Sequence, residues 1–323
     1  MKKIIPATVL SFFLFTICAA ADISFNSVAG TCGMTRFDIS SERIEYRDKN
    51  TKLLFVPPKR EIFFNNIRII PGFAPEKKLT RRRWYLRKEN DIFINSSDWY
   101  STIRPLLNPA IVPYHRIATV TLDAGHGGND TGALGKISKE KDINLKITLR
   151  TAAILRACGY RVLLTRTNDQ TVPLKNRSDI QKKHKSDLFI SIHVNAVKNS
   201  TIRGIETYAL TPENAPSTNG KPKLERHPAN IRDTNNFLLA YTLQKALLSR
   251  TGAADRGVKR ARFAVLRDIT APGALIEVGF ISNSADEKLL NSAAYIEKLS
   301  RAVAEGILTY HRTVYKYGRK QRR

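Results

Sequence analysis

From residue 117 onward, short apolar runs alternate with longer segments whose apolar residues recur at helical spacing. The apolar runs predict strands over residues 117–122, 161–164, 188–192, 204–210 and 274–278. The longer segments predict helices over residues 140–157, 174–185, 235–249 and 293–310. Strands that alternate with helices indicate an α/β fold, in which a mostly parallel sheet is flanked by helices.

The preceding part of the chain has a different pattern. Residues 53–56, 61–64, 66–70 and 92–94 are rich in β-branched and aromatic side chains, and Pro and Asn residues separate them. This pattern predicts a small β-rich N-terminal domain over residues 22–115, with a proline-containing linker over 105–113. A second domain over residues 116–312 and a basic tail over 313–323 complete the expected organisation.

The first 21 residues have the features of a signal peptide. Lys2 and Lys3 precede an apolar run to Cys18, and Ala19, Ala20 and Ala21 follow it as a cleavage pattern. The sequence therefore predicts export. The periplasm is the preferred location, and an extracellular or wall-associated location is the alternative. An uncleaved membrane anchor is a second interpretation of the same run.

Charge narrows the choice of partners. The net charge is +26, and removal of Lys2 and Lys3 lowers it to +24. Such a charge favours polyanions. For an exported protein these are anionic wall polymers or lipid head groups, and no nucleic acid is expected; the alternative is that the charge serves only solubility. A basic cluster over residues 77–88 surrounds Trp84 and Tyr85, which suits either an anion-binding patch or a strand with one solvated face.

After removal of the signal peptide, two cysteines remain. Cys32 and Cys158 could form a disulfide in an oxidising compartment. Because Cys158 ends an apolar helix, a buried thiol is the simpler interpretation.

Two histidines follow predicted strands, and a glutamate begins a predicted helix. His126 lies in a glycine-rich stretch, His193 ends the strand over 188–192, and Glu140 begins the helix over 140–157. Ligands bind at the carboxyl ends of parallel strands, and two His with one Glu are a typical catalytic zinc set. Asp123 and Asn195 are candidates to hydrogen-bond the second ring nitrogens of these histidines. The alternative is that each histidine is an ordinary polar residue that makes hydrogen bonds and binds no metal.

Glu277 stands inside an apolar strand, where an ionised group is costly without a partner. It is either the acid/base of the site or part of a buried ion pair with an arginine. The remaining histidines are expected to be ordinary surface residues: His115, His184, His227 and His311.

Taken in order, several short motifs resemble the zinc-dependent N-acetylmuramoyl-L-alanine amidases of bacterial cell walls, with an AmiA/AmiB/AmiC-like catalytic domain. The resemblance covers residues 117–310 and is carried by residues 121–128, 140–145, 162–166, 191–196, 204–208, 256–259 and 276–283. It implies that His126, Glu140 and His193 bind one zinc ion and that Glu277 is the catalytic carboxylate. It also implies hydrolysis of the amide between N-acetylmuramic acid and L-alanine in peptidoglycan.

Some members of that family hold a helix across the active site until an activator protein displaces it. The segment over 211–234 is poor in helix formers, so an activator is possible but not indicated. Two competing interpretations are a wall-binding protein without turnover and a zinc peptidase that cuts a different amide.

Overall fold

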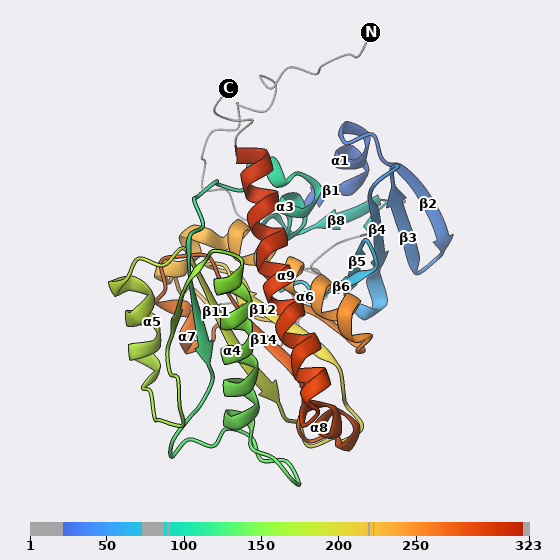
Figure 1. The fold of residues 1–323 in the computed structure, drawn as a ribbon. Helices are drawn as coiled ribbons and strands as arrows, with labels where there is room; N and C mark the ends of the chain where they lie inside the picture. The colour runs from blue at the N-terminus through green and yellow to red at the C-terminus, as the bar shows by residue number, and fades with distance from the viewer. Residues whose placement is uncertain (1–21, 73–86, 89–90, 219, 222, 319–323) are drawn as a thin grey trace.

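One sheet of eleven strands runs through both parts of the chain (Figure 1). The computed structural model describes residues 22–72, 87–88, 91–218, 220–221 and 223–318. The strand order is β10-β9-β11-β14-β12-β13-β6-β5-β4-β3-β2. The strands are β2 (Thr35–Ser40), β3 (Arg43–Arg47), β4 (Lys52–Val56), β5 (Glu61–Phe64), β6 (Ile67–Ile69), β9 (Thr119–Ala124), β10 (Arg161–Leu164), β11 (Leu188–Asn195), β12 (Ile205–Leu210), β13 (Asp255–Ala261) and β14 (Gly273–Phe280).

The C-terminal half of this sheet confirms the predicted α/β fold with a mostly parallel sheet. Strands β10, β9, β11 and β14 are parallel, β12 is antiparallel to β14, and β13 is parallel to β12. Strand β13 was not predicted from the sequence, because charged residues interrupt it. Lys259 and Arg260 are nevertheless buried in this strand, since each finds polar partners.

Helices cover both faces of the parallel part. Helices α4 (Glu140–Ala157), α6 (Asp233–Thr251) and α9 (Ala293–Gly318) pack on one face, and α5 (Leu174–Lys183) and α7 (Ala264–Arg267) lie on the other (Figure 1). Alternation along β14 matches these two layers, because Ile276 joins the main core and its neighbour Leu275 joins a smaller cluster with Val265 of α7. A short helix, α8 (Ser284–Leu290), follows β14.

The predicted β-rich N-terminal region is present. Strands β2 to β6 form an antiparallel meander, and β1 (Ile23–Ser24), β8 (Asp91–Ile94) and β7 (Arg87–Lys88) form a second, small sheet. Helix α1 (Phe25–Thr31) packs in this region through the buried Phe25. The segment expected as a linker is folded and packed. After α2 (Ser96–Asp98), η3 (Trp99–Ile103) and α3 (Arg104–Leu107) comes η4 (Pro109–Ile111), and Leu106 and Val112 are buried.

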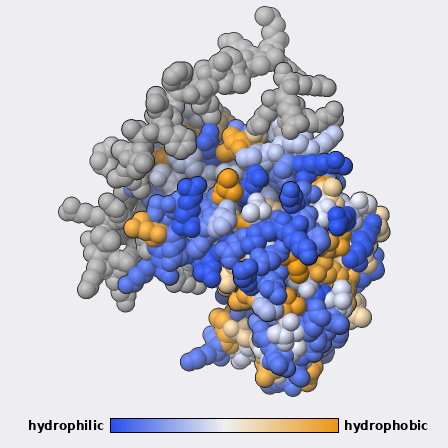
Figure 2. Space-filling model, turned by 90° about the vertical axis from the view of Figure 1, so that its left-hand side faces the viewer, coloured by the Kyte–Doolittle hydropathy of each residue, from blue (hydrophilic) through white to orange (hydrophobic). Residues whose placement is uncertain are grey.

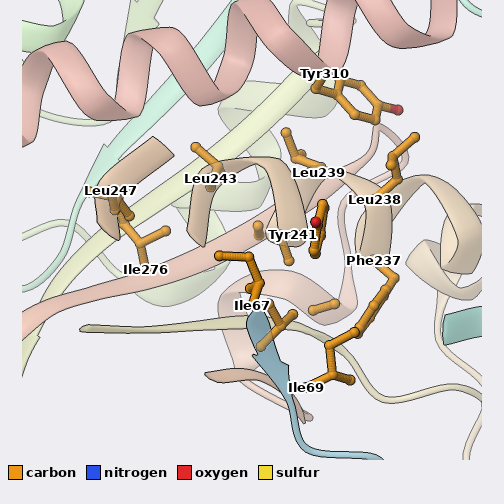
Figure 3. Close-up of a cluster of buried hydrophobic side chains, with 14 of the residues drawn as sticks. Ile67, Ile69, Phe237, Leu238, Leu239, Tyr241, Leu243, Leu247, Ile276 and Tyr310 are labelled. Atoms are coloured by element: carbon orange, nitrogen blue, oxygen red, sulfur yellow. The ribbon is translucent and has the colours of Figure 1, made fainter. Parts of the chain in front are cut away.

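The N-terminal strands and the parallel strands share one core. Ile69 of β6 pairs with Val258 of β13, and the Ile70 amide donates to the Val258 carbonyl at 2.9 Å. Figure 3 shows Ile67 and Ile69 beside side chains of α6, among them Phe237 and Tyr241. The division at residue 115 therefore stays a prediction about domains, while the sheet and the core are continuous across it.

Further expectations concern the cysteines, the two ends of the chain and the basic cluster over residues 77–88. Cys32 and Cys158 are both exposed free thiols, so the expectation of a buried thiol at Cys158 is wrong, because the helix turns this residue to the surface. Helix α9 continues to Gly318, into the expected basic tail. The predicted signal peptide and most of the basic cluster over 77–88 lie outside the described residues. Within the described residues, no helix combines the length and apolarity needed to cross a bilayer.

Candidate metal centre and active site

His126 occupies a tight loop at the carboxyl end of β9. Its φ of 62° is left-handed, which is unusual for a residue with a side chain, and Gly127 and Gly128 continue the turn with positive φ. Arg177 of α5 donates to the carbonyl of His126 at 2.8 Å and to that of Ala124 at 2.7 Å. The strained loop is therefore held from outside the strand, by a buried guanidinium.

Glu140 brings the two histidines together from the first turn of α4. Its Oε1 lies 3.3 Å from Nε2 of His126 and 3.0 Å from Nδ1 of His193. Its Oε2 accepts a hydrogen bond from the Ala133 amide at 2.8 Å. One ligand atom from each of these three residues lies within 4.8 Å of the others. The three residues that the sequence selected as ligands thus converge on one point.

The chemistry of this donor set fits a zinc ion. Burial tends to raise the pKa of Glu140, but hydrogen bonds from His126 and His193 outweigh it and hold the pKa well below its usual range. The carboxylate therefore stays ionised, as a metal ligand must be. The neighbouring glycines leave room for the ligands. A Cβ at Gly125 would lie 2.3 Å from the His193 ring, and a Cβ at Gly132 would lie 2.6 Å from Oε2 of Glu140.

The outer partners of the histidines differ from those expected. Nδ1 of His126 pairs with Asp130 at 2.8 Å. Asp123 instead accepts hydrogen bonds from Arg177 and Ser191, both at 2.7 Å, and Asn195 donates to Glu206 at 2.7 Å. The expectation that Asp123 and Asn195 orient the rings is therefore wrong, because Asp123 is engaged with α5 and β11 below the loop. Asp130, four residues after His126, has the orienting position.

Glu277 lies next to this group on the same face of the sheet. In β14 it pairs in register with His193 of parallel β11 and with Glu206 of antiparallel β12. Its side chain is 9% exposed, and among the described residues its Oε2 has no hydrogen-bond partner. Burial, and then the carboxylates of Glu140 and Glu206, raise the pKa of Glu277 well above its usual range. This unpartnered oxygen argues against a buried ion pair with an arginine.

Comparisons with known proteins identify a family for this part of the chain. Residues 120–309 match the sequence profile of the N-acetylmuramoyl-L-alanine amidase family. The chain belongs to this family.

Individual amidases match the same part of the chain. AmiA of Escherichia coli is 35% identical over 217 residues, which cover 59% of this chain and 75% of AmiA. LytC of Bacillus subtilis is also 35% identical, over 60% of this chain and 36% of LytC. Among solved structures, the catalytic domain of CwlV from Bacillus (Paenibacillus) polymyxa has 30% identity and a TM-score of 0.53, covering 61% of this chain and 99% of that domain. AmiC2 of Nostoc punctiforme has 32% identity and a TM-score of 0.52, over 60% and 97% of the two chains.

A second buried carboxylate lies beside the site of this amidase, and no role was predicted for it from the sequence. Glu206 of β12 is 2% exposed and contacts Asn195, Tyr208 and Lys259. The signal that singled out Glu277, an ionisable residue within an apolar strand, was also present for Glu206 in the strand predicted over 204–210.

The other histidines stay outside the candidate metal group of the described residues. His184 is exposed, as expected, whereas His115, His227 and His311 are half-buried, and His311 contacts the hydroxyl of Tyr160. The segment over 211–234 is tied to the protein by Arg262, which donates to the Ala215 carbonyl at 2.7 Å. Where this segment is described, it forms the short 3-10 helix η5 (Pro228–Arg232) before α6 begins.

Proposed function

We propose that this amidase hydrolyses the bond between N-acetylmuramic acid and L-alanine at the His126, Glu140 and His193 group, with one zinc ion as cofactor. The observation that carries the proposal is the convergence of two ring nitrogens and one carboxylate oxygen within 4.8 Å, beside the carboxylate of Glu277, whose Oε2 has no partner among the described residues. Such a three-ligand set leaves a coordination position for water or substrate. A zinc ion held by these three residues would supply Lewis acidity for the scissile carbonyl and for a bound water.

The protein's own groups handle the proton. Glu277 accepts a proton from the attacking water and gives it to the departing amine of L-alanine, so one carboxyl acts first as base and then as acid. Glu277 pairs in register with His193 on the neighbouring strand and therefore lies beside the candidate metal group.

We also propose that the chain is exported and meets the wall through its basic surface. The net charge of +24 that remains without Lys2 and Lys3 supports attraction to anionic wall polymers or lipid heads. Figure 2 shows a face dominated by hydrophilic side chains on the side where α5 lies, and this helix carries the exposed Lys175 and Lys183. Nucleic acid is not an expected partner, and an activator protein is possible but not indicated.

The decisive experiment is digestion of purified peptidoglycan by the chain without residues 1–21, with and without a chelator. Mass spectrometry of the soluble products identifies the bond that is cut. Release of stem peptides with a free N-terminal L-alanine, abolished by the chelator and restored by zinc, is the expected result. Fragments that begin at another residue would favour the zinc peptidase, and zinc-loaded protein without any release would favour the wall-binding protein.

A further inference from the structure

Glu206 is the centre of a polar cluster beside Glu277. Its Oε1 accepts hydrogen bonds from the amide of Asn195 at 2.7 Å and from the hydroxyl of Tyr208 at 2.6 Å. Its Oε2 accepts from the ammonium group of Lys259. A carboxylate with donors on both oxygens has little capacity left for a reacting group. Glu206 therefore organises its neighbours and leaves the proton transfer to Glu277.

Arg256 is a second cation on the same carboxylate. Its Nε lies 3.5 Å from Oε2 of Glu206, and its guanidinium lies 5.1 Å from the centre of the Phe280 ring. Within the described part of the chain, no acceptor forms a hydrogen bond with that Nε. The side chain is 29% exposed. Its position is thus fixed by a carboxylate and an aromatic ring, while part of the guanidinium faces solvent.

The cluster has one positive charge in surplus. Lys259 and Arg256 share the single negative charge of Glu206. Lys259 is 8% exposed and is satisfied by its contact with Glu206. The surplus is therefore available at Arg256. A planar guanidinium held in place is well suited to bind a carboxylate through two parallel hydrogen bonds.

The topology places Arg256 on a defined side of the reacting groups. Because β12 is antiparallel to β14 and parallel to β13, β13 begins at the sheet edge where β11 and β14 end. The strand order β11-β14-β12-β13 then puts His193 on one side of Glu277 and Arg256 on the other.

We propose that Arg256 binds a carboxylate in the peptide half of the substrate, the α-carboxylate of the residue after L-alanine, which is free where that residue ends the peptide or is joined onward through its side chain. The inference rests on the proposed function. In the proposed reaction, the carbonyl of the bond to be cut faces the candidate metal group, and the amine that leaves faces Glu277. The peptide continues from that amine, and in this proposal it passes Glu277 toward Arg256. Arg256 is thus a specificity residue that distinguishes a free carboxylate from a carboxamide at this position of the peptide.

The test compares two muramyl peptides that differ only in this group, one with the free α-carboxylate and one with the carboxamide. For the carboxylate substrate, Arg256→Gln is expected to raise KM roughly tenfold or more, since a charge-assisted hydrogen bond is lost, with little change in kcat. For the carboxamide substrate, the variant and the wild type should have similar kcat/KM. Arg256→Lys should recover part of the preference. Arg203→Gln, at an arginine on the same sheet edge, is the matched control and should leave the preference intact.

A binding measurement tests the carboxylate site at Arg256 separately from the proposed hydrolysis reaction. The free peptide product no longer carries the amide to N-acetylmuramic acid, and calorimetry should show that Arg256→Gln weakens its binding roughly tenfold only when the carboxylate is present. This result would support the carboxylate site even if the muramyl peptides were not hydrolysed. Equal effects of Arg256→Gln on carboxylate and carboxamide forms, or the same loss in Arg203→Gln, would overturn the proposal.

Discussion

Glu277 lies directly opposite Glu206 across the antiparallel β12 and β14 pair, yet the two carboxylates have different surroundings. Glu206 is bonded on both oxygens, whereas among the described residues Oε2 of Glu277 has no partner. Two adjacent buried carboxylates thus have different contacts: Glu206 contacts cations, whereas Glu277 keeps one oxygen without a hydrogen bond among the described residues.

Replacement of Glu277 by Gln should abolish proton transfer without removing a metal ligand. We expect the rate of stem-peptide release to fall by roughly 10²- to 10⁴-fold, the usual contribution of a general acid/base. Metal analysis should show an unchanged zinc content. Glu42→Gln, at an exposed carboxylate far from the site in sequence, serves as the control. Retained turnover would remove Glu277 from this role.

Gly125 leaves the space that the His193 ring occupies. In Gly125→Ala the new methyl group would lie 2.3 Å from that ring, so the ring must move away from Glu140. We expect a large loss of zinc affinity, measured by competition with a chromophoric chelator. Gly30→Ala is the control, because no atom of the described residues lies within 4 Å of the position that its methyl group would take, and no loss of affinity should result. Equal zinc affinity in both variants would contradict the ligand role of His193.

Zinc affinity should fall on acidification. The hydrogen bond to Glu140 raises the pKa of His126, against the opposing effect of burial. Below that raised pKa, a proton occupies the ring and must leave before metal binds, so affinity falls by up to about tenfold per pH unit for each displaced proton. The decline should begin above pH 6.5, the ordinary pKa of histidine. Chelator competition between about pH 8 and pH 5.5 measures it; a flat profile would show that His126 is not a ligand.

Arg260 ties the N-terminal region to the sheet. Its buried guanidinium donates to the carbonyl of Leu210 at 2.9 Å, to that of Ser101 at 2.7 Å and to the hydroxyl of Thr102 at 3.0 Å. Burial lowers its pKa to about 10, so it keeps its charge at neutral pH. Arg260→Met leaves these buried acceptors unpaired and should lower the free energy of unfolding by about 3 kcal/mol. Denaturant unfolding measures this, with the exposed Arg43→Met as a nearly neutral control.

Removal of residues 22–116 should destabilise the remaining chain. It takes away β6, which pairs with β13, and it uncovers Phe237 and Tyr241 of α6. An exposed strand edge and exposed aromatic side chains favour aggregation. We expect a lower unfolding midpoint and increased light scattering relative to the full chain. A truncated protein as stable and as monomeric as the full chain would show that the shared core contributes little.

The sequence predicted most of the parallel sheet and selected the three residues of the candidate metal group because both leave local signals. Continuous apolar runs mark β11 and β14, and His126 and His193 stand where such runs end. The join between β6 and β13 leaves no such signal, since Ile69 and Val258 are far apart in the chain. Likewise, Asp130 could not be chosen over Asp123 as the partner of His126 without knowing that the loop turns back at His126 with a positive φ.

The continuous sheet also sets the orientation of the N-terminal strands relative to the candidate active site. Since β6 and β13 are hydrogen-bonded neighbours, the N-terminal strands are joined through the sheet to the edge that carries His193 and Glu277. If the N-terminal strands bind a surface, the fold of the sheet then determines the orientation of the candidate active site and its distance from that surface.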